Sequence, residues 1–198
     1  QYRPYVFVWP FNIEMKVIMT EEQYITALTN NPHGIRNIPN PTEAMQLTCV
    51  GQNGMLLQYI KEPSEVVQLQ AVQENYLALR YINEPSVAVL EAAVKQDPQA
   101  MRQITNLSKE LALYLFKVSA PILGYIPNTL GVTVDEIKAI IVEAVSSDNI
   151  DADYVRELIN NKAIGGRQSK WPIDLLLLID AYGTRAVKKI AVGEYLKY

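Results

Sequence analysis

The sequence predicts a mainly α protein: tandem two-helix repeats stacked as a short α-solenoid, with a short β-prone N-terminal arm and a helical C-terminal domain. The first observation is a 22-residue repeat that aligns without gaps in four copies, at residues 17–38, 39–60, 61–82 and 83–104. The second is that some repeat positions keep one residue type. Position 4 is threonine or serine throughout, and position 22 is always isoleucine. A period in this range is typical of stacked supersecondary units.

Each copy carries the start and stop signals of two helices. The hydroxyl residue at position 4, such as Ser64, is a good N-cap because its oxygen accepts amide hydrogens of the first turn. Asn or Asp at position 15, such as Asn75, ends this helix and favours a turn. We therefore expect a helix of about ten residues, a turn and a second helix of about six. We also expect four equivalent buried sites at Ile38, Ile60, Ile82 and Ile104.

The repeats are flanked by two different segments. A degenerate fifth copy is predicted at residues 105–126, which extends the repeat domain to residues 17–126. Beyond it, residues 127–198 form the predicted C-terminal helical domain. There, the capping box that starts at Thr133 opens a helix through about Val145. A further helix follows Asp151 or Asp153, Trp171-Pro172 begins an apolar one, and Thr184 caps the last, in which Ala186 is expected to face inward with Val187, Ile190 and Ala191.

The N-terminal arm, residues 1–16, is rich in aromatic and β-branched residues. Its aromatic side chains at alternate positions would share one face of a strand, which is too apolar to leave in water. We therefore expect the arm to dock on its own C-terminal domain or on a partner subunit, by edge pairing. The partner-binding residues expected in the arm are Tyr5, Phe7, Trp9 and Phe11.

The repeat pattern, as it stands in Pro63-Ser64-Glu65, Asn75 and Ala78–Ile82, resembles a family of short tandem helical repeats of unknown function. Members occur in bacterial, amoebal and bacteriophage proteins. The resemblance covers residues 17–104 and extends less clearly to 126. It implies an all-helical repeat and a phage or effector origin, and it transfers no catalytic residues.

The amino-acid composition limits which disulfides, metal sites and membrane segments the chain can form. With one cysteine and one histidine, Cys49 and His33, the chain can build neither an intrachain disulfide nor a zinc site of Cys and His. Cys49 takes a repeat position that is alanine in the other three copies, which favours a buried core residue. The net charge is −3 overall, but residues 163–198 carry six basic and three acidic residues. No apolar run approaches the ~20 residues of a membrane span.

Other motifs favour structural roles. Gly165-Gly166 with Ser169-Lys170 lacks the spacing of a phosphate-binding loop, so a flexible interhelical loop is expected. Asp148, Asp151 and Asp153 lack the glycine and glutamate of a calcium loop, which favours helix capping. Repeat position 20 carries arginine in three copies, and this spaced row could bind an acidic partner or phosphates, or form a solvated face. These arginines are Arg36, Arg80 and Arg102.

We therefore expect a non-enzymatic module for protein–protein interaction or assembly, phage-encoded and part of a virion. The β-prone arm and the start at Gln1 favour the virion setting. One alternative is a soluble effector that binds and inhibits a host protein in its cytoplasm. A second is a nucleic-acid-binding or enzymatic accessory protein that uses the basic C-terminal segment. The expected partner is another protein or a second copy. No catalytic residue, cofactor, metal, small-molecule substrate or membrane association is expected.

Overall fold

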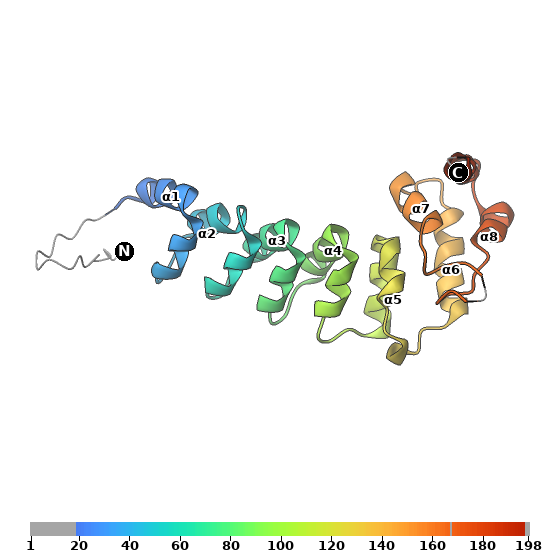
Figure 1. Cartoon of the computed structure of the whole chain (residues 1–198), viewed down its shortest axis with the longest axis horizontal. Coiled ribbons are helices and arrows are strands. Elements are labelled where there is room, and N and C mark those ends of the chain that lie inside the picture. The colour runs from blue at the N-terminus through green and yellow to red at the C-terminus, as the bar shows by residue number, and fades with distance from the viewer. Residues whose placement is uncertain (1–18, 167, 197–198) are drawn as a thin grey trace, which may run out of the picture. The chain divides into compact units, whose positions relative to one another are not determined.

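The computed structural model describes residues 19–166 and 168–196, and they are mainly helical, as the sequence predicts (Figure 1). The contacts divide the chain into two compact units, one ending at Tyr81 and the next beginning at Ile82. The predicted arm, residues 1–16, lies outside the described residues.

In the first unit, every repeat is an α-helix followed by a short 3₁₀-helix, and sequential repeats pack on one another. The second helix of the repeat was predicted, but not its 3₁₀ form. The 3₁₀ form is explained by the length of the segment, since six residues are too few to gain from the wider turn of an α-helix. The segment begins after a capping Asn in η2 and with a proline in η1. The elements are α1 (Glu21–Asn30), η1 (Pro32–Asn37), α2 (Glu43–Val50), η2 (Gly54–Tyr59), α3 (Glu65–Glu74) and η3 (Tyr76–Tyr81).

The second unit begins with two further helix pairs in the same order and then loses the period. The pairs are α4 (Val87–Gln96) with η4 (Pro98–Gln103), and α5 (Lys109–Val118) with η5 (Ala120–Gly124). The later elements are η6 (Asn128–Leu130), α6 (Val134–Val145), α7 (Ala152–Ile159), α8 (Leu175–Tyr182) and α9 (Arg185–Tyr195).

The capping residues of the repeat act largely as the sequence indicates. The side chain of Thr42 accepts a hydrogen bond from Met45 N, and that of Ser86 accepts one from Val89 N. At position 15, Asn53 and Asp97 accept hydrogen bonds from the amides two residues on, which starts η2 and η4. The prediction is wrong for Ser64, which is the N-cap of α3 but accepts no hydrogen bond from that helix, and Asn31 accepts none from η1. The repeating polar columns therefore mark where the helices begin, although not every one of them makes the capping hydrogen bond.

The position-4 hydroxyl also joins neighbouring repeats of the first unit. Thr42 Oγ1 donates to Glu21 Oε1 at 2.6 Å, and Ser64 Oγ donates to Glu43 Oε2 at 2.6 Å. Each rung therefore links position 4 of one copy to position 5 of the copy before it. This explains why threonine or serine and glutamate recur together in the first three copies.

The expectation that all four position-22 isoleucines are buried is wrong in part. Ile60 is 7% exposed, whereas Ile38, Ile82 and Ile104 are only half-buried. Ile38 and Ile60 have the same local geometry, extended after a 3₁₀-helix with the amide donating back three residues, so the repeat position does not by itself bury the side chain. Two other columns are buried in all five copies: position 12 (Leu28, Val50, Val72, Val94, Phe116) and position 19 (Ile35, Leu57, Leu79, Met101, Leu123).

Close packing within the first unit depends on Gly54. A Cβ atom there would overlap the carbonyl oxygen of Ala71 in α3. The Gly54 amide also donates to the carboxylate of Glu74, at the end of α3. Position 16 is proline in two other copies, at Pro32 and Pro98, which removes this amide donor altogether. The first amide of the 3₁₀-helix is thus either satisfied or absent in these copies.

The helices after the repeats agree with the prediction except at two points. α6 begins at the predicted capping box, in which Thr133 and Glu136 exchange hydrogen bonds, and Asp151 caps α7. α8, however, starts at Leu175 with Asp174 as N-cap, and Trp171 instead forms a β-bridge with Ile164. In α9, Val187 and Ala191 are buried as expected, whereas Ala186 is exposed.

These later segments are tied to the fifth helix pair by side-chain donors to its backbone carbonyls. Trp171 Nε1 donates to Leu123 O at 3.0 Å, and Tyr154 Oη donates to Phe116 O at 2.9 Å. Asn161 Nδ2 donates to Ala120 O at 2.7 Å. Because the carbonyls at the end of a helix have no partner within it, these donors cover what would otherwise be an open end of the repeats.

Candidate protein-interaction surface

The most unusual surface of the described chain is an apolar patch on α8 and α9 of the second unit. It comprises Leu176 and Leu177 on α8 and Val192, Tyr195 and Leu196 at the end of α9. Leu177 is 63% exposed and Leu196 81% exposed. Single exposed apolar residues are ordinary, but five on two helices in contact are unusual for a surface that faces water. We call this set the C-terminal apolar patch.

The sequence of α8 explains why it cannot bury all its leucines. Leu175 to Leu178 are four consecutive leucines, and successive residues of an α-helix point about 100° apart. Leu175 is buried in the core of the second unit, so the side chains of Leu176 and Leu177 must point away from that core. From the sequence, this run was predicted as part of an apolar helix too short to span a membrane, and its exposure was not predicted. The signal for an exposed patch was a short helix with apolar residues on every face, because such a helix can bury only one of its faces.

A cavity of about 270 Å³ opens beside the patch, which we call the α8 cavity. Leu176 and Tyr195 both line it, so it joins the α8 and α9 parts of the patch. The rest of the wall is apolar or glycine, apart from Asp174. Small-molecule sites usually exceed about 300 Å³ and carry several convergent polar groups. The α8 cavity is thus better suited to one bulky side chain.

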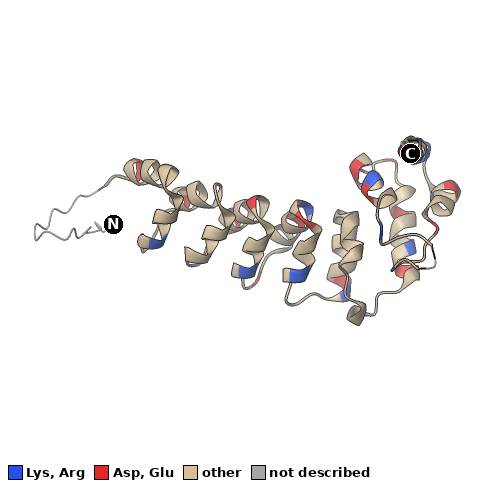
Figure 2. Cartoon of the chain, in the orientation of Figure 1, with Lys and Arg blue, Asp and Glu red and all other residues tan. Residues whose placement is uncertain are grey.

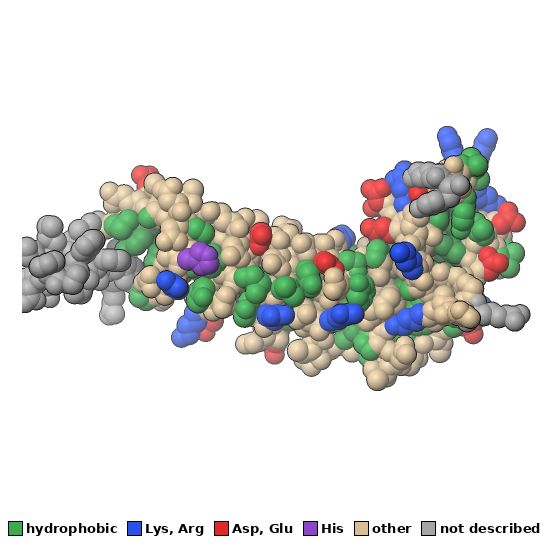
Figure 3. Space-filling model, in the orientation of Figure 1, with side chains coloured by type: hydrophobic (Ala, Val, Ile, Leu, Met, Phe, Trp, Pro, Cys, Tyr) green, Lys and Arg blue, Asp and Glu red, His purple; other side chains and the backbone are tan. Residues whose placement is uncertain are grey.

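The charges around the patch are arranged by helix. On α8, Asp174 and Asp180 are exposed, and Asp174 Oδ1 accepts a hydrogen bond from Leu177 N. On α9, Arg185, Lys188 and Lys189 are exposed. Figure 3 shows Lys and Arg side chains beside apolar ones in the α8–α9 part of the surface. A partner would therefore meet carboxylates along α8 and cations along α9.

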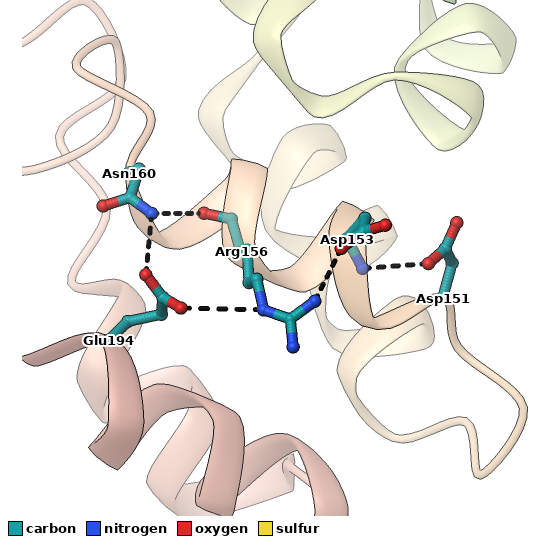
Figure 4. Close-up of polar contacts among 5 residues, drawn as sticks. All are labelled: Asp151, Asp153, Arg156, Asn160 and Glu194. Atoms are coloured by element: carbon teal, nitrogen blue, oxygen red, sulfur yellow. Dashed lines mark hydrogen bonds and ion pairs between the residues drawn. The ribbon is translucent and has the colours of Figure 1, made fainter.

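A polar network holds α9 in place against α7 (Figure 4). The carboxylate of Glu194 is nearly buried, with an exposed fraction of 9%. It accepts a hydrogen bond from Asn160 Nδ2 at 3.3 Å and faces Arg156 Nε at 3.6 Å. Arg156 also pairs with Asp153 at 2.6 Å. Because a buried carboxylate without partners is costly, this network fixes which face of α9 points outward.

A second groove in the same unit, of about 540 Å³, has a mixed lining. Lys95 and Lys117, at the same position of successive repeats, lie with Glu143 and Asp151 among its walls. Lys117 Nζ pairs with Glu143 at 2.7 Å. In this pair each charge neutralises the other, and exposed ion pairs contribute little to the stability of the fold. The groove favours no particular ligand.

The predicted arginine row is divided between the two units, so its role as a binding row stays a prediction. Arg36 and Arg80 lie in the first unit, exposed in the last turns of η1 and η3 (Figure 2). Arg102 lies in the second unit, where its guanidinium stacks over the Tyr125 ring at 5.2 Å. This contact occupies one face of the guanidinium. The other expected binding residues, Tyr5, Phe7, Trp9 and Phe11, lie outside the described residues.

The glycine loop and the aspartate cluster have structural contacts. Lys170 Nζ donates to the carbonyl oxygens of Gly124 and Ile126, at the end of the fifth helix pair. Burial lowers the pKa of Lys170. Asp151 accepts from the Asp153 amide at 2.8 Å, which is the expected capping role. Among the described residues, no three His, Cys, Asp or Glu side chains are grouped to hold a metal ion.

Cys49 is fully buried in α2, as the repeat alignment indicates, whereas His33 is exposed in η1. Burial raises the pKa of the Cys49 thiol to about 11. A buried neutral thiol is a poor nucleophile, because the thiolate is the reactive form. Cys49 therefore belongs to the core of the first unit.

This burial predicts a pH effect on stability. An unfolded thiol ionises near its ordinary pKa of 9.0, but the folded one holds its proton to about 11. As pH rises through this window, ionisation favours the unfolded chain, and stability should fall by on the order of 2 kcal/mol. Urea titrations at pH 8.5 and 11, compared with Cys49→Ala, would measure it. An equal pH dependence in both proteins would contradict the prediction.

Comparison with protein-family models, curated proteins and solved structures finds no match to this chain. The resemblance to the short helical-repeat family therefore stays a prediction. In the part of the chain that the structure describes, no helix has the length and apolarity needed to cross a bilayer.

Proposed function

We propose that this protein is a non-enzymatic interaction module that binds another protein through the C-terminal apolar patch. The observation that carries the proposal is the exposure of five large apolar side chains on two adjoining helices, beside a cavity that fits one side chain. Binding sites of this kind use bulky anchors in pockets, surrounded by a polar rim. Asp174, Asp180 and Lys188 would provide such a rim.

The setting we propose is assembly, with the repeats as a spacer and the patch as the contact. A virion component fits this use, and so does an effector that binds a host protein. Nucleic-acid binding through Arg185, Lys188 and Lys189 is less well supported. These three cations share the outward face of α9 with apolar residues, and the neighbouring α8 presents carboxylates that would repel phosphates.

The proposal is tested by changing the patch while leaving the fold intact. Leu177→Asp and Leu196→Asp place charge at exposed positions, so circular dichroism and thermal stability should stay unchanged. Each should abolish recovery of a protein partner from a lysate of the source. Val66→Asp is the matched control, since Val66 is 55% exposed in α3 of the other unit.

The proposal requires that wild type and Val66→Asp recover the same protein partner and that Leu177→Asp and Leu196→Asp both fail to recover it. Identical recovery by all four proteins would overturn it. Recovery of nucleic acid alone, sensitive to salt rather than to Leu177→Asp, would instead support the basic face of α9.

A further inference from the structure

We infer that the occupant of the C-terminal apolar patch is the aromatic N-terminal arm of a second copy of this chain. This inference rests on the proposed function and names its partner. Each copy would offer one arm and one patch, which are different surfaces. Such a contact is heterologous and joins copies head to tail.

The chemistry of the α8 cavity fits an aromatic occupant. Its wall combines apolar side chains with the Asp174 carboxylate and glycine backbone, and its volume of about 270 Å³ suits a single large side chain. The first eleven residues of the chain hold five of its seventeen aromatic residues, among them Phe7 and Trp9. Aromatic side chains are the strongest anchors of protein interfaces because they bury a large area with few rotatable bonds. No helical repeat position remains to take them up, because the repeats begin after residue 16.

The charges around the patch favour one orientation of the arm. Residues 1–11 carry a single charged side chain, Arg3, which is positive. The α8 side of the patch carries Asp174, at the cavity itself, and Asp180. The α9 side carries the cations Arg185, Lys188 and Lys189, so Arg3 would lie toward the carboxylates of α8, and this charge pattern sets the orientation of binding rather than its strength.

The arm is attached to the first compact unit, whereas the patch belongs to the second, so no contact within one unit brings them together. The expected edge pairing needs a strand. The described residues contain only the single bridge between Ile164 and Trp171, so the arm would bind through its side chains.

The test is a complementation experiment with full-length chains in sedimentation velocity. Wild type should associate as its concentration rises. An arm variant, Phe7→Ser with Trp9→Ser, and a patch variant, Leu177→Asp, should each associate at least about tenfold more weakly alone. Mixed together, they should form a one-to-one heterodimer, because the mixture contains one intact arm and one intact patch. Val66→Asp should associate as wild type does.

A mixture in which the two variants stay monomeric would overturn the inference, as would a wild type that is monomeric at every concentration. If the patch variants also lose a lysate partner in that case, the proposed function stands with a foreign partner. If the patch variants recover the same lysate partners as wild type, both proposals fail. If the arm variant alone weakens association and the mixture shows no complementation, the arm binds a surface other than the patch, which would also overturn the inference.

Discussion

Gly54→Ala is expected to destabilise the first unit by roughly 3 kcal/mol, the upper end of the range for overpacking. The added Cβ would overlap the Ala71 carbonyl oxygen, which is fixed backbone in α3 and cannot rotate away. Separating α3 from η2 would also weaken the hydrogen bond between the Gly54 amide and Glu74. Urea denaturation followed by circular dichroism would measure the loss.

Gly34→Ala is the matched control in the same unit. Gly34 lies in η1, two positions further along its repeat, and the nearest atom to a new Cβ is Leu28 Cδ2 at 3.4 Å, the end of a flexible side chain. It should be tolerated or slightly stabilising, since alanine lowers the entropy of the unfolded chain. If Gly54→Ala and Gly34→Ala have the same free energy of unfolding, η2 does not pack on α3 in this way.

Trp171→Ala should have the second large effect, a loss of roughly 3–5 kcal/mol in the second unit. Trp171 is 6% exposed, and its indole donates to Leu123 O. The variant leaves a cavity where the indole was buried and removes the donor to the carbonyl oxygen of Leu123 in η5. Hydrogen exchange should therefore rise first around Leu123, within the fifth helix pair.

Trp171→Phe separates packing from hydrogen bonding. Phenylalanine keeps most of the buried ring but donates no hydrogen bond, so a smaller loss of roughly 1–2 kcal/mol is expected. Faster exchange around Leu123 should persist in this variant. Unchanged exchange there in both variants would mean that Trp171 does not hold the fifth helix pair.

The fold could be predicted from sequence wherever the determinant is local. Thr42 caps its helix through an amide three residues away, and Asn53 starts η2 through an amide two residues away. Determinants of this kind are visible in a window of a few residues, and their recurrence every 22 residues made the repeat evident. The capping box at Thr133 was predicted for the same reason.

The features that escaped prediction depend on contacts distant in sequence. Gly54 is required by a carbonyl seventeen residues further on, and the partner of Trp171 precedes it by 48 residues. The half-burial of Ile82 could not be read from its identity, because the same residue type at Ile60 is buried. Exposure of Leu177 depends on which face of α8 packs inward, and nothing in a run of four leucines specifies that face.

The rungs between Thr42 and Glu21 and between Ser64 and Glu43 have a consequence for how such a chain can change in length. A copy of residues 39–60 duplicated after Ile60 would present its own threonine to Glu43 and its own glutamate to Ser64, so every donor and acceptor would again be matched. The same duplication after Ile104 would set the new threonine beside Val87, which offers no acceptor. The coding sequence can therefore gain whole repeats by unequal recombination within the first unit at little cost in stability, and less readily after Ile104.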